Sequence, residues 1–413
     1  MNSTLLHCLF EFRMINFDFN EYCCGCTACF NSCAFEAITM KPNKEGFIIP
    51  SVNAEKCTEC GKCEKACPFL NLRTTTSQQS INDFYDKKAY LYFSKAEQRK
   101  ESASGGFVYD LFANTLNKKG IICGCVWDQN INAKHIISNK VDDLERMQGS
   151  KYVQSDLGKC FSDIKTNLKQ GKDVIFCGTP CQTAGLHFYL GKTDKSHLTI
   201  VCLICHGVPS PKVWNKYKSI LEKKYGGKLI NVNMRDKSYK GYSTSYVKYT
   251  FIRDSKEDNN NLHNLKHVGK PTYLSDPYIF LFTDNLFLRN SCYHCAYKGN
   301  NNMADIIVGD FYASHPQAGN DGCSSLIAMT EKGEKIISSL NGNLIPMDIN
   351  SVASPNPMLW KSVKKHSERS NFFLDLDNLD NISLFTKYLP YKFHIKKILN
   401  NLGLFKIVQS LIK

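Results

Sequence analysis

The stretches CCGCTACFNSC, residues 23–33, and CTECGKCEKAC, residues 57–67, decide how the first part of this chain folds. Both place cysteines in the spacing C-x2-C-x2-C-x3-C, and Pro68 follows the second run. A cubane [4Fe–4S] cluster needs one thiolate for each iron, and in two-cluster ferredoxins the fourth cysteine of each run binds the other cluster. The repeat therefore predicts an α+β ferredoxin-like module, residues 15–70, with two [4Fe–4S] clusters.

The crossing rule divides the eight cysteines into two ligand sets. The first cysteine set consists of Cys23, Cys26, Cys29 and Cys67, and the second of Cys57, Cys60, Cys63 and Cys33. Zinc knuckles also use C-x2-C, but a zinc ion takes four ligands and does not need two interlocked runs. Ala34 replaces the usual proline without touching a ligand, and we interpret the additional thiol of Cys24 as a bystander. Residues 38–40 and 47–49 predict a short hairpin that covers the clusters.

Composition limits the class of protein and its compartment. A chain of 413 residues with 43% hydrophobic and 22% charged residues is typical of a soluble globular protein with two or three domains. The sequence contains no uncharged apolar stretch of about 18 residues, so we expect no transmembrane helix. Residues 1–14 form an N-terminal extension without the features of a signal peptide. Twenty cysteines, clustered at metal spacings and without an export signal, favour the reducing cytoplasm over a disulfide framework.

The chain has a net charge of +14, and its excess of basic residues lies outside the ferredoxin-like module. Residues 15–70 carry seven acidic and five basic residues, a net charge of −2, so the rest of the chain carries +16. A basic body favours an anionic partner, such as a phosphate-bearing cofactor, an acidic redox protein or a membrane surface. We expect no nucleic-acid partner, because no basic-aromatic binding motif is present. In the basic C-terminal region, residues 346–413, the amphipathic segment from Leu384 favours either packing on the domain or peripheral membrane contact.

The region after the module has the pattern of a second fold. Polar residues 71–84 predict a linker, and residues 85–345 predict an α/β domain with a mixed, largely parallel sheet, because helix-like and strand-like segments alternate. The stretch 254–270, rich in asparagine and charge, predicts an exposed loop. We expect helices at 106–118, 156–169 and 182–190, and strands at 121–127, 173–177, 198–205, 244–253, 305–308 and 324–330.

A third group of thiols belongs to the carboxyl edge of this sheet, where open α/β sheets bind ligands. Cys181 and Cys205 each follow a predicted strand, and a further C-x2-C pair lies downstream. We expect this third cysteine set, Cys181, Cys205, Cys292 and Cys295, to bind a third [4Fe–4S] cluster. A zinc site with Cys202 in place of Cys181 is an alternative, as are inert thiols. Residues three apart in a strand point to opposite faces, so Cys202 and Cys205 can both bind zinc only if the strand has already ended.

Two glycine-containing turns could also face an anionic cofactor group. Gly178-Thr179-Pro180-Cys181-Gln182 connects a strand to a helix, and Ser104-Gly105-Gly106 precedes another helix. Free backbone amides at a helix start attract phosphate groups. Many helix starts look the same for capping reasons alone, so these turns are weak predictors by themselves.

Taken together, the motifs resemble the beta-subunit family of coenzyme F420-reducing hydrogenase and dehydrogenase, in the branch with an N-terminal two-cluster ferredoxin. The resemblance extends from Cys23 to about Gly342. Its carriers are Ser104-Gly105-Gly106, Gly149-Ser150-Lys151-Tyr152-Val153-Gln154-Ser155, Gly178-Thr179-Pro180-Cys181-Gln182, Cys205-His206-Gly207-Val208-Pro209-Ser210-Pro211, Ser291-Cys292-Tyr293-His294-Cys295 and Ala304-Asp305-Ile306-Ile307-Val308-Gly309-Asp310-Phe311.

The resemblance implies a bound FAD with a cluster near it on the third cysteine set. It places Lys151 beside the flavin, as a partner of its phosphate or of a reduced flavin anion; the alternative is an ordinary surface lysine. Two departures are Asn290, in place of a proline, and Tyr312-Ala313-Ser314, in place of Trp-Gly, which falls in the pocket over the flavin. The implied flavin contacts are Ser104, Gly105, Gly106, Lys151, Gly178, Thr179, Pro180 and Gln182, with Asp310 nearby.

The implied activity is that of an iron–sulfur flavoprotein oxidoreductase. Such a protein passes electrons between a one-electron carrier, ferredoxin or another redox protein, and a hydride-accepting organic substrate. The family name suggests coenzyme F420, a deazaflavin, as that substrate, and a small or sugar-linked molecule is an open alternative. A function of another class is a non-catalytic subunit that relays electrons to a partner enzyme, including one of polysaccharide biosynthesis.

Overall fold

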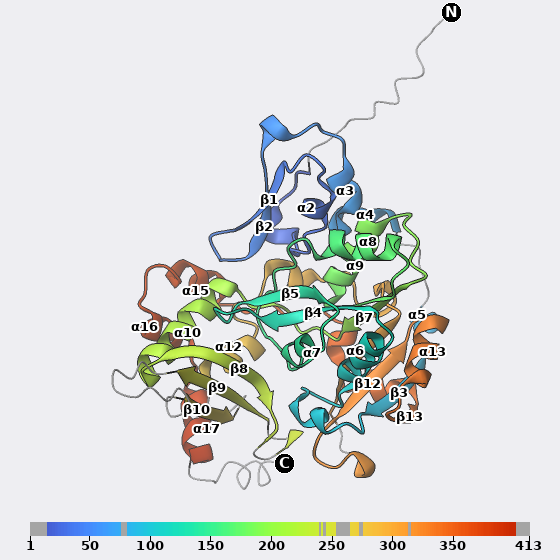
Figure 1. Ribbon diagram of the computed structural model, residues 1–413. Helices are drawn as coiled ribbons and strands as arrows, with labels where there is room; N and C mark the ends of the chain where they lie inside the picture. Colours follow the sequence, from blue (N-terminus) through green and yellow to red (C-terminus); the bar gives the residue numbers. More distant parts are fainter. Residues whose placement is uncertain are drawn as a thin grey trace, which may run out of the picture.

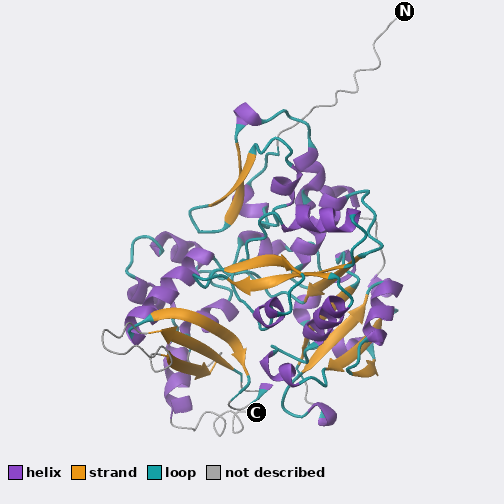
Figure 2. Ribbon diagram, in the orientation of Figure 1, coloured by secondary structure: helices purple, strands orange, loops and turns teal. Residues whose placement is uncertain are grey.

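The computed structural model describes residues 15–75, 81–238, 241–242, 245–252, 265–271, 276–312 and 315–401. The chain forms a cysteine-rich module, a large sheet with helices on both faces, and a smaller sheet beside it (Figures 1 and 2). None of the helices in these described ranges is long and apolar enough to cross a membrane.

The N-terminal module combines short helices with the predicted hairpin. Strands β1 (Ile38–Pro42) and β2 (Ile48–Val52) pair antiparallel. The hairpin turn ends at Gly46, whose φ of +86° suits glycine, and Asn43 Oδ1 accepts a hydrogen bond from the Phe47 amide at 2.9 Å. The module therefore has the α+β fold that the cysteine repeat predicts. Its helices are α1 (Phe19–Tyr22), α2 (Ala28–Ser32), α3 (Lys62–Ala66) and α4 (Pro68–Thr75).

The large sheet has the strand order β13-β3-β12-β11-β7-β6-β4-β5. Its centre, from β11 through β7 and β6 to β4, is parallel, whereas the flanking pairs are antiparallel. The predicted α/β domain with a mixed, largely parallel sheet is thus confirmed. The strands are β3 (Lys88–Phe93), β4 (Ile121–Trp127), β5 (Ala133–Ser138), β6 (Val174–Gly178), β7 (Leu198–Leu203), β11 (Ile306–Phe311), β12 (Cys323–Ala328) and β13 (Asn343–Met347).

Alternating side chains of the sheet face two helical layers. On β6, Ile175 packs in the same cluster as residues of α6, while Phe176 packs with α8 and α9. In Figure 1, α8 and α9 lie between the sheet and the cysteine-rich module. The third cysteine set therefore begins on the helix that faces this module. The helices around the large sheet are α5 (Ile81–Tyr85), α6 (Phe107–Asn117), α7 (Asp142–Arg146), α8 (Cys160–Lys169), α9 (Pro180–Leu190), α13 (Glu331–Ser339) and α14 (Ile349–Ala353).

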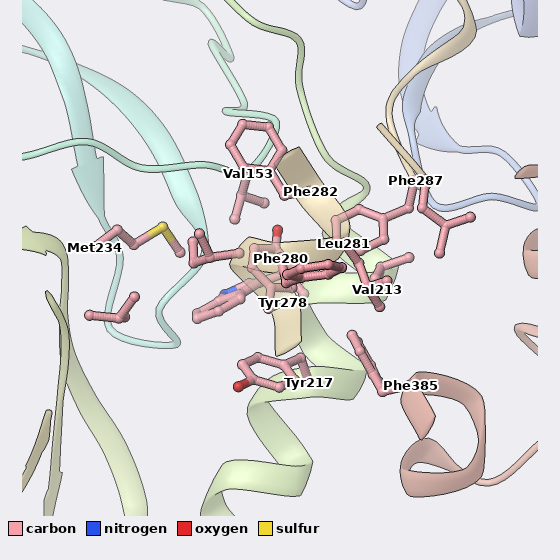
Figure 3. Close-up of a cluster of buried hydrophobic side chains, with 14 of the residues drawn as sticks. Val153, Val213, Tyr217, Met234, Tyr278, Phe280, Leu281, Phe282, Phe287 and Phe385 are labelled. Carbon is pink, nitrogen blue, oxygen red and sulfur yellow. The ribbon is translucent and has the colours of Figure 1, made fainter. Parts of the chain in front are cut away.

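The smaller sheet, with the order β10-β9-β8, is antiparallel and packs on an aromatic-rich core (Figure 3). In this core Tyr217 and Tyr278 stack at 5.5 Å between ring centroids, and Phe385 contacts Tyr217 at 5.1 Å. The elements that form it are β8 (Lys228–Asp236), β9 (Tyr246–Ile252), β10 (Leu265–Pro271), α10 (Pro211–Tyr225), α12 (Pro277–Thr283), α15 (Arg369–Asp375), α16 (Asn381–Tyr388) and α17 (Tyr391–Asn401).

Two expectations about segments differ from the structure. The stretch 254–270, expected to be a loop, contains the start of β10, an edge strand whose lysines hid its strand character, because edge strands commonly carry charges. The predicted linker 71–84 contains the end of α4 and most of α5, where Phe84 packs on Trp360 at 4.3 Å between ring centroids. The N-terminal extension and residues 402–413 of the C-terminal region lie outside the described residues.

Candidate iron–sulfur and flavin site

The first cysteine set lines one cavity of the N-terminal module. Its four thiol side chains are 6–9% exposed, and Ile15, Met40 and Phe69 line the same space. Burial is the main reason that the pKa of Cys67 is raised to about 11. A positively charged metal would stabilise the deprotonated form of such buried thiols. The four thiols that line this cavity have the donor chemistry for an iron–sulfur cluster.

The second cysteine set lines a separate cavity. All four of its cysteines are only partly buried, and Phe35, at the rim of this cavity, is 51% exposed. Cys33 comes from the first sequence run and lines the cavity of the second run, while Cys67 does the reverse. Each cavity is therefore lined by the four cysteines that the crossing rule assigns to one cluster.

Backbone geometry directs amides toward these sulfurs. The amide of Gly25 donates to Cys23 Sγ and that of Ala37 donates to Cys33 Sγ, both at 3.3 Å. Thr27 and Gly61, which precede α2 and α3, share a left-handed conformation with φ of 61° and 67°. Amide donors to cysteine sulfur stabilise negative charge and tune the potential of a cluster.

The third cysteine set lies on three connected elements. Cys181 is in the first turn of α9, Cys205 follows β7, and Cys292 lies in a single 3₁₀ turn, Asn290–His294, just before Cys295. Each thiol acts electrostatically on others of the set, and burial chiefly raises the pKa of Cys292 to about 12 and of Cys295 to about 11. The Val208 amide donates to Cys292 Sγ at 3.4 Å. The structure thus brings these four thiols together.

The predicted strand 198–205 ends earlier than expected, because β7 ends at Leu203 and Cys205 lies beyond it. The condition for joint binding by Cys202 and Cys205 is therefore met, and strand alternation does not argue against a zinc site that includes Cys202. Among the described residues, no three His, Cys, Asp or Glu side chains are grouped closely enough to hold a single metal ion. Cys202 itself accepts a hydrogen bond from Asn302 at 3.0 Å.

Cys24 is more than the bystander that the sequence indicated. Its thiol interacts electrostatically with those of Cys26, in the first set, and Cys181, in the third. It also lines the cavity of the first set. No spacing rule could reveal this interaction, because it depends on how α9 packs against the module.

The module is fixed to the large domain through buried polar contacts. Arg289, which is 2% exposed, donates through Nε to the Cys23 carbonyl and through Nη2 to the Ile48 carbonyl at 3.1 Å. Ser291, next to Cys292, also donates to the Cys23 carbonyl, at 3.1 Å. A second anchor is the two-pronged ion pair of Arg369 with Glu45, at 2.9 and 2.6 Å. The first and third sets are therefore held against each other.

The predicted flavin residues gather at the carboxyl edge of the large sheet, in two groups. Ser104 donates to the Cys323 carbonyl, and the Gly105 amide donates to Ser324 Oγ at 3.1 Å; Ser324 pairs with Asp310 across β12 and β11. A side chain on Gly105 would collide with the backbone of β3 and β12, since its Cβ would lie 2.2 Å from the Tyr92 carbonyl oxygen. Gly105 is thus required for packing, whether or not a cofactor binds.

The other group consists of Lys151 and the turn from Gly178 to Gln182. Lys151 donates to the carbonyls of Arg146, Gln148 and Gly149 at 3.1, 2.6 and 3.3 Å, and burial lowers its pKa to about 8. The side-chain Oε1 of Gln182 accepts a hydrogen bond from the Thr179 backbone amide at 2.9 Å, which closes a capping box, and its Nε2 donates to Ser155 Oγ at 2.9 Å. The side chains of Lys151 and Gln182 therefore already have protein partners, which is a structural role that the sequence interpretation did not give them.

Sequence reasoning missed two cations from β8 and the loop after it. Arg235, 7% exposed, pairs with Asp310 at 2.9 Å and contacts Tyr152 Oη at 3.4 Å. Lys237, 5% exposed, donates to the carbonyls of Arg99, Ser104 and Asp321, and burial lowers its pKa to about 8. The two residues point to the same edge of the sheet as Asp310. The alternation of Arg235 and Lys237 was a possible signal, since it puts both on one face of an extended segment.

Two protein-family models match separate parts of this architecture. Residues 171–346 match the C terminus of the beta subunit of coenzyme F420 hydrogenase/dehydrogenase, and residues 22–71 match a 4Fe-4S dicluster domain. The chain is thus similar to these beta subunits over residues 171–346 and carries a 4Fe-4S dicluster domain near its N-terminal end. The first match contains the third cysteine set, and the second contains the first and second sets.

Individual relatives cover only parts of the chain or are remote. An uncharacterized polyferredoxin-like protein of Methanocaldococcus jannaschii is 31% identical over 88 residues, which are 19% of this chain and 52% of that protein. The chain thus spans about half the length of this curated relative. A chain of the F420-reducing [NiFe] hydrogenase complex from Methanosarcina barkeri aligns over 73% of this chain and 92% of its own, with 17% identity and a TM-score of 0.41.

Proposed function

We propose that this chain is an FAD-dependent oxidoreductase with three [4Fe–4S] clusters. It exchanges electrons between a ferredoxin-type carrier and a hydride-accepting organic substrate, either a deazaflavin such as coenzyme F420 or a small or sugar-linked molecule. The observation that carries the proposal is the order of the three cysteine sets. The second set is partly exposed, and the first is buried and shares α2 and α3 with it. The third is held against the first, since Ser291, next to Cys292, donates a hydrogen bond to the Cys23 carbonyl at 3.1 Å.

The residues of the two ferredoxin sets fit [4Fe–4S] clusters. Each set offers four thiols around its own cavity, and backbone amides donate to a sulfur in each set. The third set fits for a similar reason, since its thiols are buried and Val208 donates to Cys292. The nearby cations Arg289 and Lys298 would offset part of the negative charge of four thiolates.

The carboxyl edge of the sheet offers cationic residues for a flavin. FAD, when bound, exchanges both hydrides and single electrons. Arg235, Lys237 and Lys151 lie at this edge, and Asp310 compensates only the first of them directly. A surplus of buried positive charge favours an anionic group, so these side chains would hold the phosphates or the reduced isoalloxazine anion. Tyr312, 62% exposed beside Asp310, offers an aromatic surface for an organic substrate.

The test is anaerobic purification, with reconstitution by iron, sulfide and FAD. We expect about twelve iron atoms and one FAD per chain, because each cubane holds four irons. Reduced ferredoxin should then reduce added coenzyme F420 or another hydride acceptor. About eight irons without FAD would contradict both the third cluster and the flavin.

The second candidate function is a relay subunit that converts no organic substrate itself. The specific observation in its favour is that Lys151 and Gln182, two expected flavin residues, are fully engaged with protein groups. The isolated chain distinguishes the two functions. A relay would oxidise and reduce its clusters with dithionite and ferredoxin but would leave deazaflavin unchanged.

Helix α17 supports an additional peripheral contact with a membrane or a partner. Phe393 is buried and contacts Phe280 at 5.0 Å, whereas Tyr391 and Ile398 are 79% and 58% exposed. The helix therefore uses one face for packing and leaves apolar side chains on another. We expect the full chain to bind vesicles with anionic lipids, and a chain that ends at Pro390 to bind them less. Equal binding by the two would contradict this contact.

A further inference from the structure

The buried cation Arg289, at the contact between the ferredoxin-like module and the large domain, is held by neutral groups. It is 2% exposed; Nε and Nη2 donate to the carbonyls of Cys23 and Ile48, and Nη1 has no hydrogen-bond partner among the described residues. The other buried arginine at this contact, Arg369, instead forms two hydrogen bonds with the carboxylate of Glu45. A buried charge is costly unless an opposite charge compensates it. The surroundings of Arg289 therefore indicate an anion that the side chains around it do not supply.

Gln154 provides a second buried donor at the same place. It is 5% exposed, and its Oε1 accepts a hydrogen bond from the Ile48 amide at 3.1 Å. Because a backbone amide can only donate, this bond fixes the orientation of the side chain, and Nε2 remains a donor without a partner in the described part of the chain. A Cβ atom on Gly25 would lie 2.8 Å from Arg289 Nη1 and closer still to Gln154 Nε2. The two donors therefore meet at Gly25.

Gly25 belongs to the wall of the cavity that the first cysteine set lines. It borders this cavity itself, and its amide donates to Cys23 Sγ at 3.3 Å. Its φ of +69° and its lack of a side chain allow Arg289 and Gln154 to approach this part of the loop. A [4Fe–4S] cluster with four thiolate ligands is anionic, so a cluster on the first set would supply the negative charge that Arg289 lacks.

The second cysteine run has the opposite charge at the equivalent position. Glu59 lies two residues after Cys57, as Gly25 lies two residues after Cys23, and its φ of +52° is also positive. Glu59 is exposed and lines the cavity of the second set. A positive charge beside a cluster stabilises its reduced state, which carries one more negative charge, and a carboxylate has the reverse effect. The repeat thus places a buried cation beside one cluster and an exposed anion beside the other.

We propose that Arg289 and Gln154 make the first cluster easier to reduce than the second, so that an electron received at the exposed second cluster moves inward. The effect rests on the proposed function only for its two ferredoxin clusters, and not for the third cluster or FAD. In this step the second cluster is oxidised and the first is reduced by one electron, and no bond or proton is transferred. Burial alone acts in the other direction, because nonpolar surroundings disfavour the more negative reduced state; the two donors at Gly25 more than offset it.

The experiment compares the full-length, reconstituted protein with Gln154→Glu, a change that nearly preserves the shape of the side chain. The new carboxylate can still accept the hydrogen bond from the Ile48 amide, but it replaces the donor beside Arg289 with a negative charge. The control is Gln98→Glu, which adds the same charge at an exposed residue of the 3₁₀ helix Glu97–Glu101. The measurements are iron per chain and an anaerobic redox titration followed by electron paramagnetic resonance.

Ligand variants assign each redox couple to its cluster, since Cys29→Ala removes the signal of the first cluster and Cys60→Ala that of the second. In the wild type, the first cluster should be reduced before the second. At a fixed potential, Gln154→Glu should lower the ratio of reduced to oxidised first cluster about tenfold, a shift of about 59 mV for one electron, and leave the second cluster unchanged. Gln98→Glu should leave both couples as in the wild type.

Reduction of the second cluster before the first in the wild type would overturn the proposal, as would Gln154→Glu with full iron content and an unchanged first couple. If Gln154→Glu loses iron, Gln154→Met decides, because it removes the donor without adding a charge. It should lower the same ratio about threefold, and an unchanged ratio would be contrary to the proposal. A wild-type protein with about eight irons refutes only the third cluster and leaves this test intact, whereas fewer irons would overturn the ferredoxin clusters and this proposal together.

Discussion

The first and second cysteine sets have the same sequence spacing but opposite surroundings. The first set is 6–9% exposed, contacts α9 of the large domain and borders the third set. The second set is partly exposed, and the exposed side chains of Phe35 and Glu59 lie at its rim. The two halves of a symmetric sequence repeat therefore have different roles. The first set faces the third set inside the protein, and the second set faces solvent, where an external electron carrier can approach.

The largest expected effect, on iron content and stability, comes from removing one cysteine ligand from the first or the second set. Cys29→Ala and Cys60→Ala should each lose about four irons per chain. Only Cys29→Ala should also destabilise the protein by about 3 kcal/mol or more, because it empties a buried cavity next to the domain contact. Iron analysis and thermal unfolding of the two variants measure both effects. Equal destabilisation would show that the two sets are equally embedded.

The next effect concerns the anchors of the two sets. Arg289→Met should cost about 3 kcal/mol, since it leaves the Ile48 carbonyl without a donor in a buried region and weakens the contact with the Cys23 carbonyl. The control is Lys159→Met, which removes an exposed ion pair with Glu36 at 3.2 Å and should cost less than about 0.5 kcal/mol. Denaturant unfolding checks both, and similar losses would argue against a buried anchor.

A smaller effect should follow from adding single side chains at two glycines. Gly185→Ala should destabilise the protein by about 1–2 kcal/mol despite the better helix propensity of alanine, because its Cβ meets Cys26. Gly61 lies next to Cys60 of the second set. Gly61→Asn should change the free energy of unfolding by less than about 0.5 kcal/mol, because no atom lies within 4 Å of the added Cβ and asparagine tolerates the φ of +67°. If Gly185→Ala unfolds at the same denaturant concentration as the wild type, the close contact of α9 with the module is wrong.

The smallest effect on stability is expected at the rim of the second set. Phe35→Ser should leave the free energy of unfolding unchanged within about 0.5 kcal/mol, since the ring is 51% exposed. It should nevertheless slow the reduction of the clusters by ferredoxin severalfold, because an exposed aromatic is a typical contact in a protein interface. Stopped-flow mixing with reduced ferredoxin measures this rate. An unchanged rate would place the docking surface elsewhere.

Periodicity and cysteine spacing predicted the module, its hairpin, and the elements α6, β4, α8, β6, α9 and β7, but not β5 or α7. These elements have strong local signals: a four-cysteine repeat, alternating apolar runs and glycine-bearing turns. The smaller sheet was only partly predicted, because β8 and β10 carry many polar side chains and are stabilised by strand pairing and by the aromatic core.

The candidate site was predictable to the extent that it follows sequence motifs. The four thiols of the third set were grouped from their positions after strands and in a C-x2-C pair. Cys24, Arg289, Arg235 and Lys237 were not recognised, since their contacts depend on how separate elements pack. Gln182 was assigned to a cofactor, although a capping box explains its side chain equally well.

The most direct test is whether electrons must pass through the cluster of the first set on their way from the second set to the flavin at the carboxyl edge of the large sheet. Reconstituted wild-type protein and Cys29→Ala, each loaded with FAD, are mixed anaerobically with reduced ferredoxin, and flavin absorbance is followed. The account predicts that Cys29→Ala binds FAD and accepts hydride from reduced deazaflavin normally, while ferredoxin reduces its flavin at least tenfold more slowly. Flavin reduction by ferredoxin at the wild-type rate in Cys29→Ala would contradict it.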